Sequence, residues 1–317
     1  MFEFLKNHTY PIGVDMGNDI IKLVQLGTNG RGVVLIAAVS SEKRPEDIPP
    51  GSVLWQRWAI EALSRLTANG KFAGKCVTAA IPAGEVFIEH IKMPKINDGK
   101  ESQMQEAVLS KIKQRLTFEA EKAMIKYIPA EDDNMVVIAT EREKVDRHLA
   151  VYEKANLQIQ SISAWPTALI NVYVKFFGRR KTDLNAVVML LDTEEDCTNI
   201  VICRHRSLFF ARSIPLGASQ LAAGTNEVIM RLVLELSACR RQFSSMYKNA
   251  QIERMIFISG QVLDKGICTT IAKQLELPAQ IGDCLAAVEI AGHPEIAGVD
   301  RRDSQFSWAA AFGLSLS

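Results

Sequence analysis

Hydrophobic residues form short runs along the first 82 positions, and these runs predict a regular order of elements. The apolar runs, which are typical of buried strands, lie at residues 10–16, 20–26, 32–39 and 76–81. Between the third and fourth runs, residues 53–66 carry apolar side chains such as Trp58 and Leu63 near helical spacing. The first part of the chain is therefore predicted to fold as β-β-β-α-β.

A similar order recurs in the second half of the chain. Predicted strands lie there at residues 186–191, 197–203, 208–214 and 255–260. A long helix is predicted at about 227–247, another at 264–275, and an apolar terminal helix at 307–316. Repetition of one unit indicates an internal duplication, and therefore two related α/β domains.

A segment with a different pattern separates the two units. Residues 86–91 alternate between polar and apolar side chains as in a strand, and residues 101–116 carry Met104, Val108 and Ile112 at helical spacing. Further predicted elements are strands near 124–128 and 135–139 and a helix at 141–154. We interpret residues 86–163 as an inserted α+β subdomain. The first domain then comprises residues 1–85, 164–182 and 307–317, and the second comprises 183–306.

Composition limits the classes of partner. The 317 residues are 48% hydrophobic and include 37 Lys and Arg against 36 Asp and Glu, so net charge does not favour a nucleic acid. Six cysteines occur without a Cys-x-x-Cys pair, which is typical of reduced core cysteines in a cytoplasmic protein. We find no apolar run near the roughly 20 residues that span a bilayer.

Candidate chemistry begins at the turn after the first predicted strand. Asp15 and Gly17 form an Asp-x-Gly sequence, followed by Asn18 and Lys22. A glycine lets the backbone turn sharply, and a carboxylate with a nearby Lys can face a metal-bound phosphate. An ordinary edge hairpin with a surface Lys explains the same residues.

The order of motifs along residues 10–316 resembles the actin/Hsp70/sugar-kinase superfamily and, within it, the PilM-like type IV pilus assembly proteins of the FtsA/PilM branch. The sequence segments that match the family include Phe118-Glu119-Ala120-Glu121 and Glu153-Lys154-Ala155-Asn156-Leu157. In the latter, Asn156 replaces a usual Gly, and we expect it to end a helix in the left-handed conformation.

The resemblance implies a fold class and a nucleotide site. It implies an α/β, actin-like (ribonuclease H-like) two-domain fold with an inserted α+β subdomain and a trimmed outer part of the second domain. It also implies ATP with Mg²⁺ as the cofactor. Its site residues would be Asp15, Gly17, Asn18, Lys22, Asp192 and Gly260, with Asp15 and Asp192 at the metal.

The chain departs from the family pattern at this site. Glu194 replaces the glycine of the second phosphate loop, and Gln261 replaces one of the two glycines of the adenosine-side turn. The segment after Ser219 that would cover the nucleoside is short. The acidic residues 192–196 fit a solvated turn, a metal-dependent phosphate site or a cation site. We expect weak or absent ATP binding and assign no catalytic residue.

The function implied by the resemblance is that of a cytoplasmic scaffold. In the family, PilM binds the amino-terminal peptide of a PilN-like inner-membrane protein in a pilus or type II-like secretion platform. By similarity, the peptide groove would lie among residues 86–91, the helix at 101–116 and the surroundings of Trp165. The protein would work at the inner face of the inner membrane and reach the membrane only through its partner, without a nucleic acid. The alternatives are an active ATPase or small-molecule kinase of the superfamily, and a division-type filament protein.

Overall fold

The computed structural model describes residues 8–30, 32–93, 101–223, 226–291 and 306–317. The start of the predicted first domain, residues 1–7, and residues 292–305 near the end of the predicted second domain therefore lie outside the described residues.

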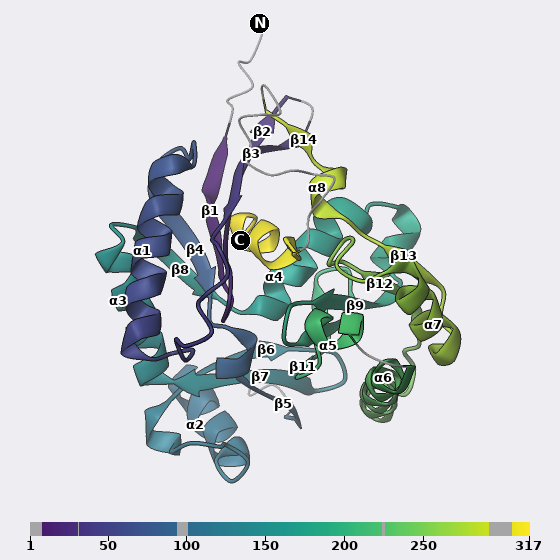
Figure 1. Ribbon diagram of the computed structural model, residues 1–317. Helices are drawn as coiled ribbons and strands as arrows, with labels where there is room; N and C mark the ends of the chain where they lie inside the picture. Colours follow the sequence, from purple (N-terminus) through teal and green to yellow (C-terminus); the bar gives the residue numbers. More distant parts are fainter. Residues whose placement is uncertain (1–7, 31, 94–100, 224–225, 292–305) are drawn as a thin grey trace, which may run out of the picture.

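One sheet joins strands that are far apart in the sequence. Its strand order is β14-β3-β2-β1-β4-β8 (Figure 1). The bounds, in that order, are Glu289–Ile290, Gly32–Ser40, Ile21–Asn29, Thr9–Met16, Cys76–Ala80 and Gln158–Ser163. Strand β1 is antiparallel to β2 and parallel to β4, and β4 is parallel to β8.

A second, separate sheet repeats this topology. Its strand order is β11-β10-β9-β12-β13. The bounds, in that order, are Ser207–Ile214, Thr198–Arg204, Val187–Thr193, Ile252–Phe257 and Ala279–Ile281. Strand β9 is antiparallel to β10 and parallel to β12, which is parallel to β13. Each pairing has its counterpart between β3 and β8 of the first sheet, which confirms the predicted internal duplication.

Helices separate and cover the two sheets. Helices α4 (Trp165–Val172) and α9 (Ala309–Ser315) lie between the sheets (Figure 1), in a core that contains Val24 from one sheet and Leu190 from the other. The outer faces are covered by α1 (Val53–Asn69) and α3 (Arg142–Lys154) on the first sheet, and by α6 (Asn226–Met246) and α7 (Lys265–Leu275) on the second.

Short helical segments complete these domains. They are η1 (Ala83–Glu85), η3 (Tyr173–Phe177), η4 (Lys181–Leu184), α5 (Ala218–Ala223) and α8 (Cys284–Ala287). In the part of the chain that the structure describes, only α5 lies between β11 and α6, as the predicted trimming of the second domain requires.

The inserted subdomain is built on a small sheet with the strand order β5-β7-β6. Its elements are β5 (Phe87–Lys92), α2 (Glu101–Ile112), η2 (Ala120–Lys122), β6 (Ala123–Pro129) and β7 (Asn134–Glu141). Helix α2 packs Val108 and Ile112 against Met135 and Val137 on one face of this sheet.

The predicted boundary of the insertion at residue 163 is too far along the chain. Helix α3 buries Val151 and Tyr152 in the core beneath α1, and β8 pairs with β4 of the first sheet. The insertion therefore ends near Glu141, where β7 ends. Strand β14 lies within residues 183–306, the predicted second domain, but it pairs with β3 and also belongs to the first sheet.

One local prediction concerns the end of α3. Asn156 has φ 59°, and the amide of the next residue, Leu157, donates to the carbonyl of Tyr152 at 3.0 Å. This is a left-handed helix end with its last carbonyls satisfied, and it confirms that Asn can take the place of Gly at this position.

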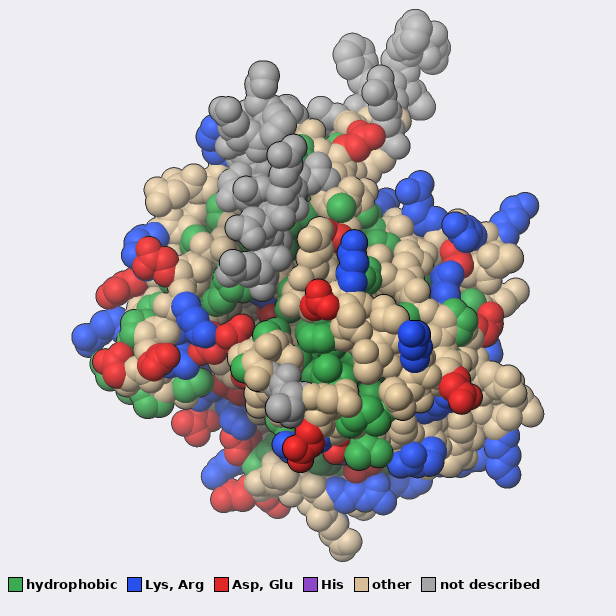
Figure 2. Space-filling view, turned by 45° about the vertical axis from the view of Figure 1, so that its right-hand side comes forward, with side chains coloured by type: hydrophobic (Ala, Val, Ile, Leu, Met, Phe, Trp, Pro, Cys, Tyr) green, Lys and Arg blue, Asp and Glu red, His purple; other side chains and the backbone are tan. Residues whose placement is uncertain are grey.

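The surface mixes both signs of charge. Figure 2 shows Lys and Arg side chains interspersed with Asp and Glu over the face that it displays, in agreement with a formal net charge of +1. Within the described ranges, no helix has both the length and the apolar character needed to cross a bilayer.

Candidate functional site

Two equivalent turns of the duplicated fold face each other. One follows β1 and contains residues 17–20; the other follows β9 and contains residues 194–197. In each case the last acid of the strand pairs in register with a polar residue of the next strand. Asp15 lies opposite Lys22, and Asp192 lies opposite Asn199.

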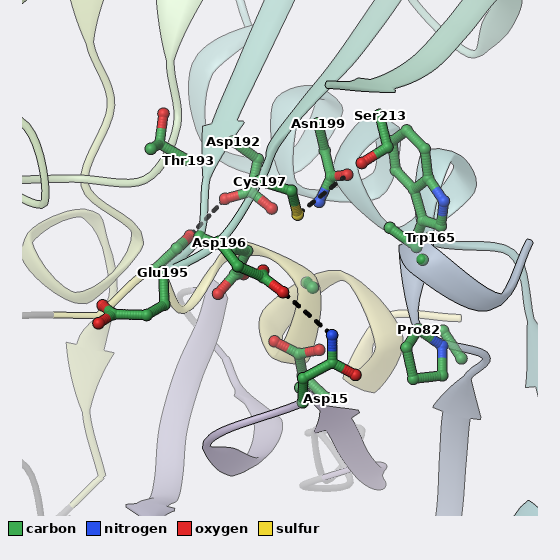
Figure 3. A pocket seen from close by; sticks show the side chains of 18 of the residues that line it. Asp15, Pro82, Trp165, Asp192, Thr193, Glu195, Asp196, Cys197, Asn199 and Ser213 are labelled. Carbon is green, nitrogen blue, oxygen red and sulfur yellow. Dashed lines mark hydrogen bonds between the residues drawn. The ribbon is translucent and has the colours of Figure 1, made fainter. Parts of the chain in front are cut away.

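A cavity of about 440 Å³ lies between these turns. Figure 3 shows Asp15 and Asp196 on opposite sides of it, and Trp165 and Pro82 at its flank. Its wall continues from the two turns along residues 80–84 and 86–88 to Arg212 and Ser213 of β11 and to Pro215 in the loop that follows. The same cavity therefore touches both domains and the start of the inserted subdomain.

Lys22 is the centre of the polar end of the cavity. Its ammonium group lies 2.7 Å from Asp15 Oδ2, 3.0 and 2.8 Å from the two carboxylate oxygens of Glu194, and 2.7 Å from the carbonyl oxygen of Ser307. The side chain is fully buried. Burial acts to lower the pKa of Lys22, but the carboxylates of Asp15 and Glu194 together raise it above its ordinary value, so Lys22 is charged.

Further side-chain contacts join the same turns. Asn18 Nδ2 donates to Asp196 Oδ2 at 3.0 Å, and Lys43 Nζ lies 2.8 Å from Glu195 Oε1. With the Lys22–Glu194 pair, each acid of the 194–196 turn contacts a polar side chain of the first domain. We call these contacts the acidic clasp.

Only one of the two carboxylate oxygens of Asp192 accepts a hydrogen bond from the described residues. Its side chain is 0% exposed, Ser307 Oγ donates to Oδ1, and Oδ2 has no hydrogen-bond partner among the described residues. Burial raises the pKa of Asp192 to about 6, against the opposing effects of Ser307 and Lys22. Burial likewise raises the pKa of Glu194, against the opposing effect of Lys22. This end of the cavity is therefore short of positive charge.

The structure brings most of the predicted site residues together. Asp15, Gly17, Asn18, Lys22 and Asp192 all line the cavity. Gly260 does not line it. Gly260 adopts φ +70°, and its amide donates to the carbonyl of Gly282 at 3.1 Å, so the glycine turn is present at a separate place.

Sequence reasoning missed several partners in this site. Glu194 was expected to repel a phosphate, not to occupy Lys22. Nothing local in the sequence indicates that Lys43 pairs with Glu195 or that Ser307 packs against Asp192. Asn199 had a usable signal, because its position after Asp192 equals that of Lys22 after Asp15.

Some of the residues that we expect to form the peptide groove line the cavity, and the groove itself stays a prediction. Trp165 and the first residues of β5, Phe87 and Ile88, line the cavity. Helix α2 does not, because its apolar side packs on the β5-β7-β6 sheet through Val108 and Ile112.

The acids of the site do not form a closed metal cage. Over the described ranges, no group of three or more His, Cys, Asp and Glu side chains is arranged to hold a metal ion. The predicted roles of Asp15 and Asp192 at a metal therefore remain predictions. The donors that would meet a phosphate, Lys22 and Asn18, are bonded to carboxylates of the clasp.

Solved structures with a similar fold include pilus and secretion components. A PilM-PilN type IV pilus biogenesis complex has a chain with TM-score 0.78 and 18% identity, over 97% of this chain and 98% of that chain. The cytoplasmic domain of EpsL, an inner-membrane component of the type II secretion system of Vibrio cholerae, has TM-score 0.47 and 10% identity, over 80% and 82%. The ethanolamine utilization protein EutJ from Carboxydothermus hydrogenoformans has TM-score 0.49 and 13% identity, over 97% and 89%.

A comparison with curated protein sequences gives no match. The model of one protein family matches residues 13–232, which is more than half of the chain, and that family is described as type IV pilus assembly protein PilM. The duplicated sheets and the two facing turns are those of the actin-like fold. This chain therefore belongs to the PilM family of type IV pilus assembly proteins.

Proposed function

We propose that this chain is a scaffold of a type IV pilus assembly machine, and that its cavity binds the amino-terminal segment of a PilN-like membrane protein. The observation that carries this proposal is the composition of the cavity wall. Residues 86–88, at the start of β5, and residues 212–213 of β11 line the same cavity, and each strand is the outermost one of its sheet in the described part of the chain.

Outermost strands leave backbone groups free to pair with an added segment. An extended peptide can bond to such an edge through its main chain and place alternate side chains in adjacent pockets. Here the apolar walls of those pockets are Trp165, Ile88 and Ala310. The chain of the similar solved structure belongs to a complex with PilN, which supports the choice of partner.

We further propose that the protein does not turn over ATP. A nucleoside triphosphate would have to displace Glu194 from Lys22 and approach the other two acids of the acidic clasp, Glu195 and Asp196. A carboxylate about 4 Å from a phosphate oxygen costs on the order of 1–4 kcal/mol, which corresponds to about one to three decades of affinity. The residues present do not fit Mg²⁺-ATP in this arrangement, and no hydrolytic step is assigned to them.

The proposed place of action follows from the partner. The chain would lie in the cytoplasm, at the inner face of the inner membrane, and would be held there by the membrane protein whose amino-terminal segment it binds. Protein-free vesicles should therefore not sediment it at physiological salt.

Peptide binding tests the proposal directly. The probe is a fluorescently labelled peptide of the first ~20 residues of a PilN-like protein, and its binding is measured by anisotropy. A segment of that length can span a standard peptide groove. Ser213→Arg places a bulky side chain in the cavity wall, and Ser244→Arg makes the same change on the exposed side of α6. We expect saturable binding that Ser213→Arg weakens at least about tenfold and Ser244→Arg leaves unchanged. Absence of binding, or equal effects of the two variants, would refute the proposal.

A further inference from the structure

The cavity has two chemically different ends. Toward the inserted subdomain it is apolar, with Trp165, Ile88 and Val86 in the wall. Between the two turns it is acidic, with Asp15, Asp192 and Glu194 in the wall. A ligand that enters along the apolar end therefore meets carboxylates at the far end.

The acidic end has more negative charge than its own cations neutralise. Lys22 forms ion pairs with both Asp15 and Glu194, and Lys43, which does not line the cavity, forms an ion pair with Glu195. Asp192 Oδ1 accepts a hydrogen bond from the neutral hydroxyl of Ser307. Its other oxygen, Oδ2, has no hydrogen-bond partner within the described part of the chain. Figure 3 shows this second oxygen on the side of the cavity that faces Asn199 and Cys197.

An ionised carboxylate that is buried without a donor is strongly unfavourable, and a positively charged donor removes the penalty. A divalent metal ion fits less well than an organic cation. Magnesium requires nearly octahedral oxygen coordination, and the described residues supply no metal-binding group of three acids, cysteines or histidines here.

The apolar walls define the rest of the ligand. Lys and Arg carry a charged head on an aliphatic stem, and such stems pack on apolar surfaces while the head reaches a polar partner. A stem beside Trp165 and Ile88 would direct its head toward the acidic end of the same cavity.

We propose that the free oxygen of Asp192 is the recognition site for an Arg or Lys side chain that the bound peptide inserts into the cavity. The proposal rests on the proposed function, because the peptide has to occupy the apolar end first. It adds a chemical requirement on the partner: a cation on an otherwise apolar segment.

The experiment compares two peptides and three proteins. One peptide is the amino-terminal segment of the PilN-like protein, and the other carries citrulline for each Arg and acetyl-lysine for each Lys, so that shape is kept and charge is lost. The proteins are the unchanged chain, Asp192→Asn, and the control Asp146→Asn on the exposed side of α3. Asparagine keeps the size of the side chain and the hydrogen bond from Ser307, so Asp192→Asn should remain folded.

We expect Asp192→Asn to weaken binding of the charged peptide at least about tenfold and to leave binding of the neutral peptide unchanged. The control should bind each peptide like the unchanged chain. Equal losses for both peptides, or no loss, would overturn the role of Asp192 while leaving the groove intact. Displacement of the charged peptide by millimolar MgCl₂ from the unchanged chain, but not from Asp192→Asn, would overturn it in favour of a metal site. If neither peptide binds the unchanged chain, the proposed function itself fails.

Discussion

The ammonium of Lys22 contacts both carboxylate oxygens of Glu194, at 3.0 and 2.8 Å, so the β1–β2 hairpin and the turn after β9 share one ion pair. Lys22 belongs to β2 of the first domain, and Glu194 follows β9 of the second. The carboxylate occupies a donor that would otherwise be available to a phosphate. The pair consequently joins the domains and fills the site at the same time.

Removal of the Lys22 charge should destabilise the protein strongly. Lys22→Met leaves Asp15 and Glu194 facing each other without a cation, and breaking a buried pair in this way costs about 3–5 kcal/mol. Lys43→Met breaks the exposed pair with Glu195 and should cost less than about 1 kcal/mol. Urea unfolding measures both values. Equal losses for the two variants would show that the Lys22 pair does not hold the domains together.

Nucleotide affinity should rise when the acidic clasp is removed. Mg²⁺-ATP is expected to bind the unchanged chain weakly or not at all, and Glu194→Gly combined with Asp196→Gly should raise its affinity by about one to three decades. The reason is that the change frees Lys22 and Asn18 and deletes two negative charges. Calorimetry with Mg²⁺-ATP is the measurement. A sub-micromolar dissociation constant for the unchanged chain, abolished by Asp15→Ala, would contradict this expectation and favour the ATPase alternative.

The joint between the inserted subdomain and the second domain should weaken in acid. His90 of β5 stacks on Phe210 of β11, with ring centroids 4.3 Å apart, and its Nε2 accepts a hydrogen bond from the amide of Ala211 at 3.2 Å. Burial, assisted by Arg212, lowers the pKa of His90 to about 4. The unfolded chain therefore binds a proton at higher pH than the folded one. The contribution of His90 to the stability of the folded chain is fully present above its unfolded pKa of about 6.5, and it is lost as the pH falls toward 4.

The loss of stability attributable to His90 is at most about 3.5 kcal/mol, since a shift of one pKa unit corresponds to about 1.4 kcal/mol. Thermal unfolding measured between pH 7 and pH 4.5 reports this loss of stability, because the interval covers most of the pH range over which His90 affects it. His90→Phe keeps an aromatic stack and should flatten the pH dependence. His205→Asn, in a turn where Asn tolerates the observed φ of 48°, should not change it. An unchanged slope in His90→Phe would show that other groups carry the acid sensitivity.

Helix α9 tolerates no added atom at Gly313. A Cβ there would collide with the carbonyl oxygen of Ala168 in α4, where neither backbone can move freely. Gly313→Ala should therefore cost more than about 2 kcal/mol by overpacking the core. A Cβ at Gly84 meets open space, so Gly84→Ala should stay within about 0.5 kcal/mol of the unchanged chain. Chemical unfolding of the two variants provides the comparison, and a stable Gly313→Ala protein would mean that α9 is packed less tightly.

Much of the fold follows from local patterns in the sequence. Buried strands such as β9 are almost continuously apolar, and helix α1 has its apolar residues at helical spacing, so both kinds of element could be predicted. The domain boundaries were less accessible. Whether β8 pairs with β4 or with the inserted sheet depends on a contact between segments some 80 residues apart, which no local pattern reports.

The site was predictable only on one side of each contact. Asp15 and Lys22 could be identified because they flank an Asp-x-Gly turn between two predicted strands. Asp192 could be identified because the duplication places it at the equivalent strand end. The partner of Lys22 was not predictable, because Glu194 reads as a surface acid until the two domains are brought together. Such long-range ion pairs are set by the packing of domains rather than by local preference.

The burial of α9 between the sheets also bears on the order in which the protein folds during synthesis. The second sheet is complete once residues 187–281 have been made. The first sheet begins at Thr9, yet α9, which packs on β1, starts only at Ala309. At ~5–20 residues per second, roughly 15–60 s pass on the ribosome between the synthesis of β1 and that of α9. We therefore expect the second domain to fold first, while the amino-terminal strands wait for the last helix to close their core.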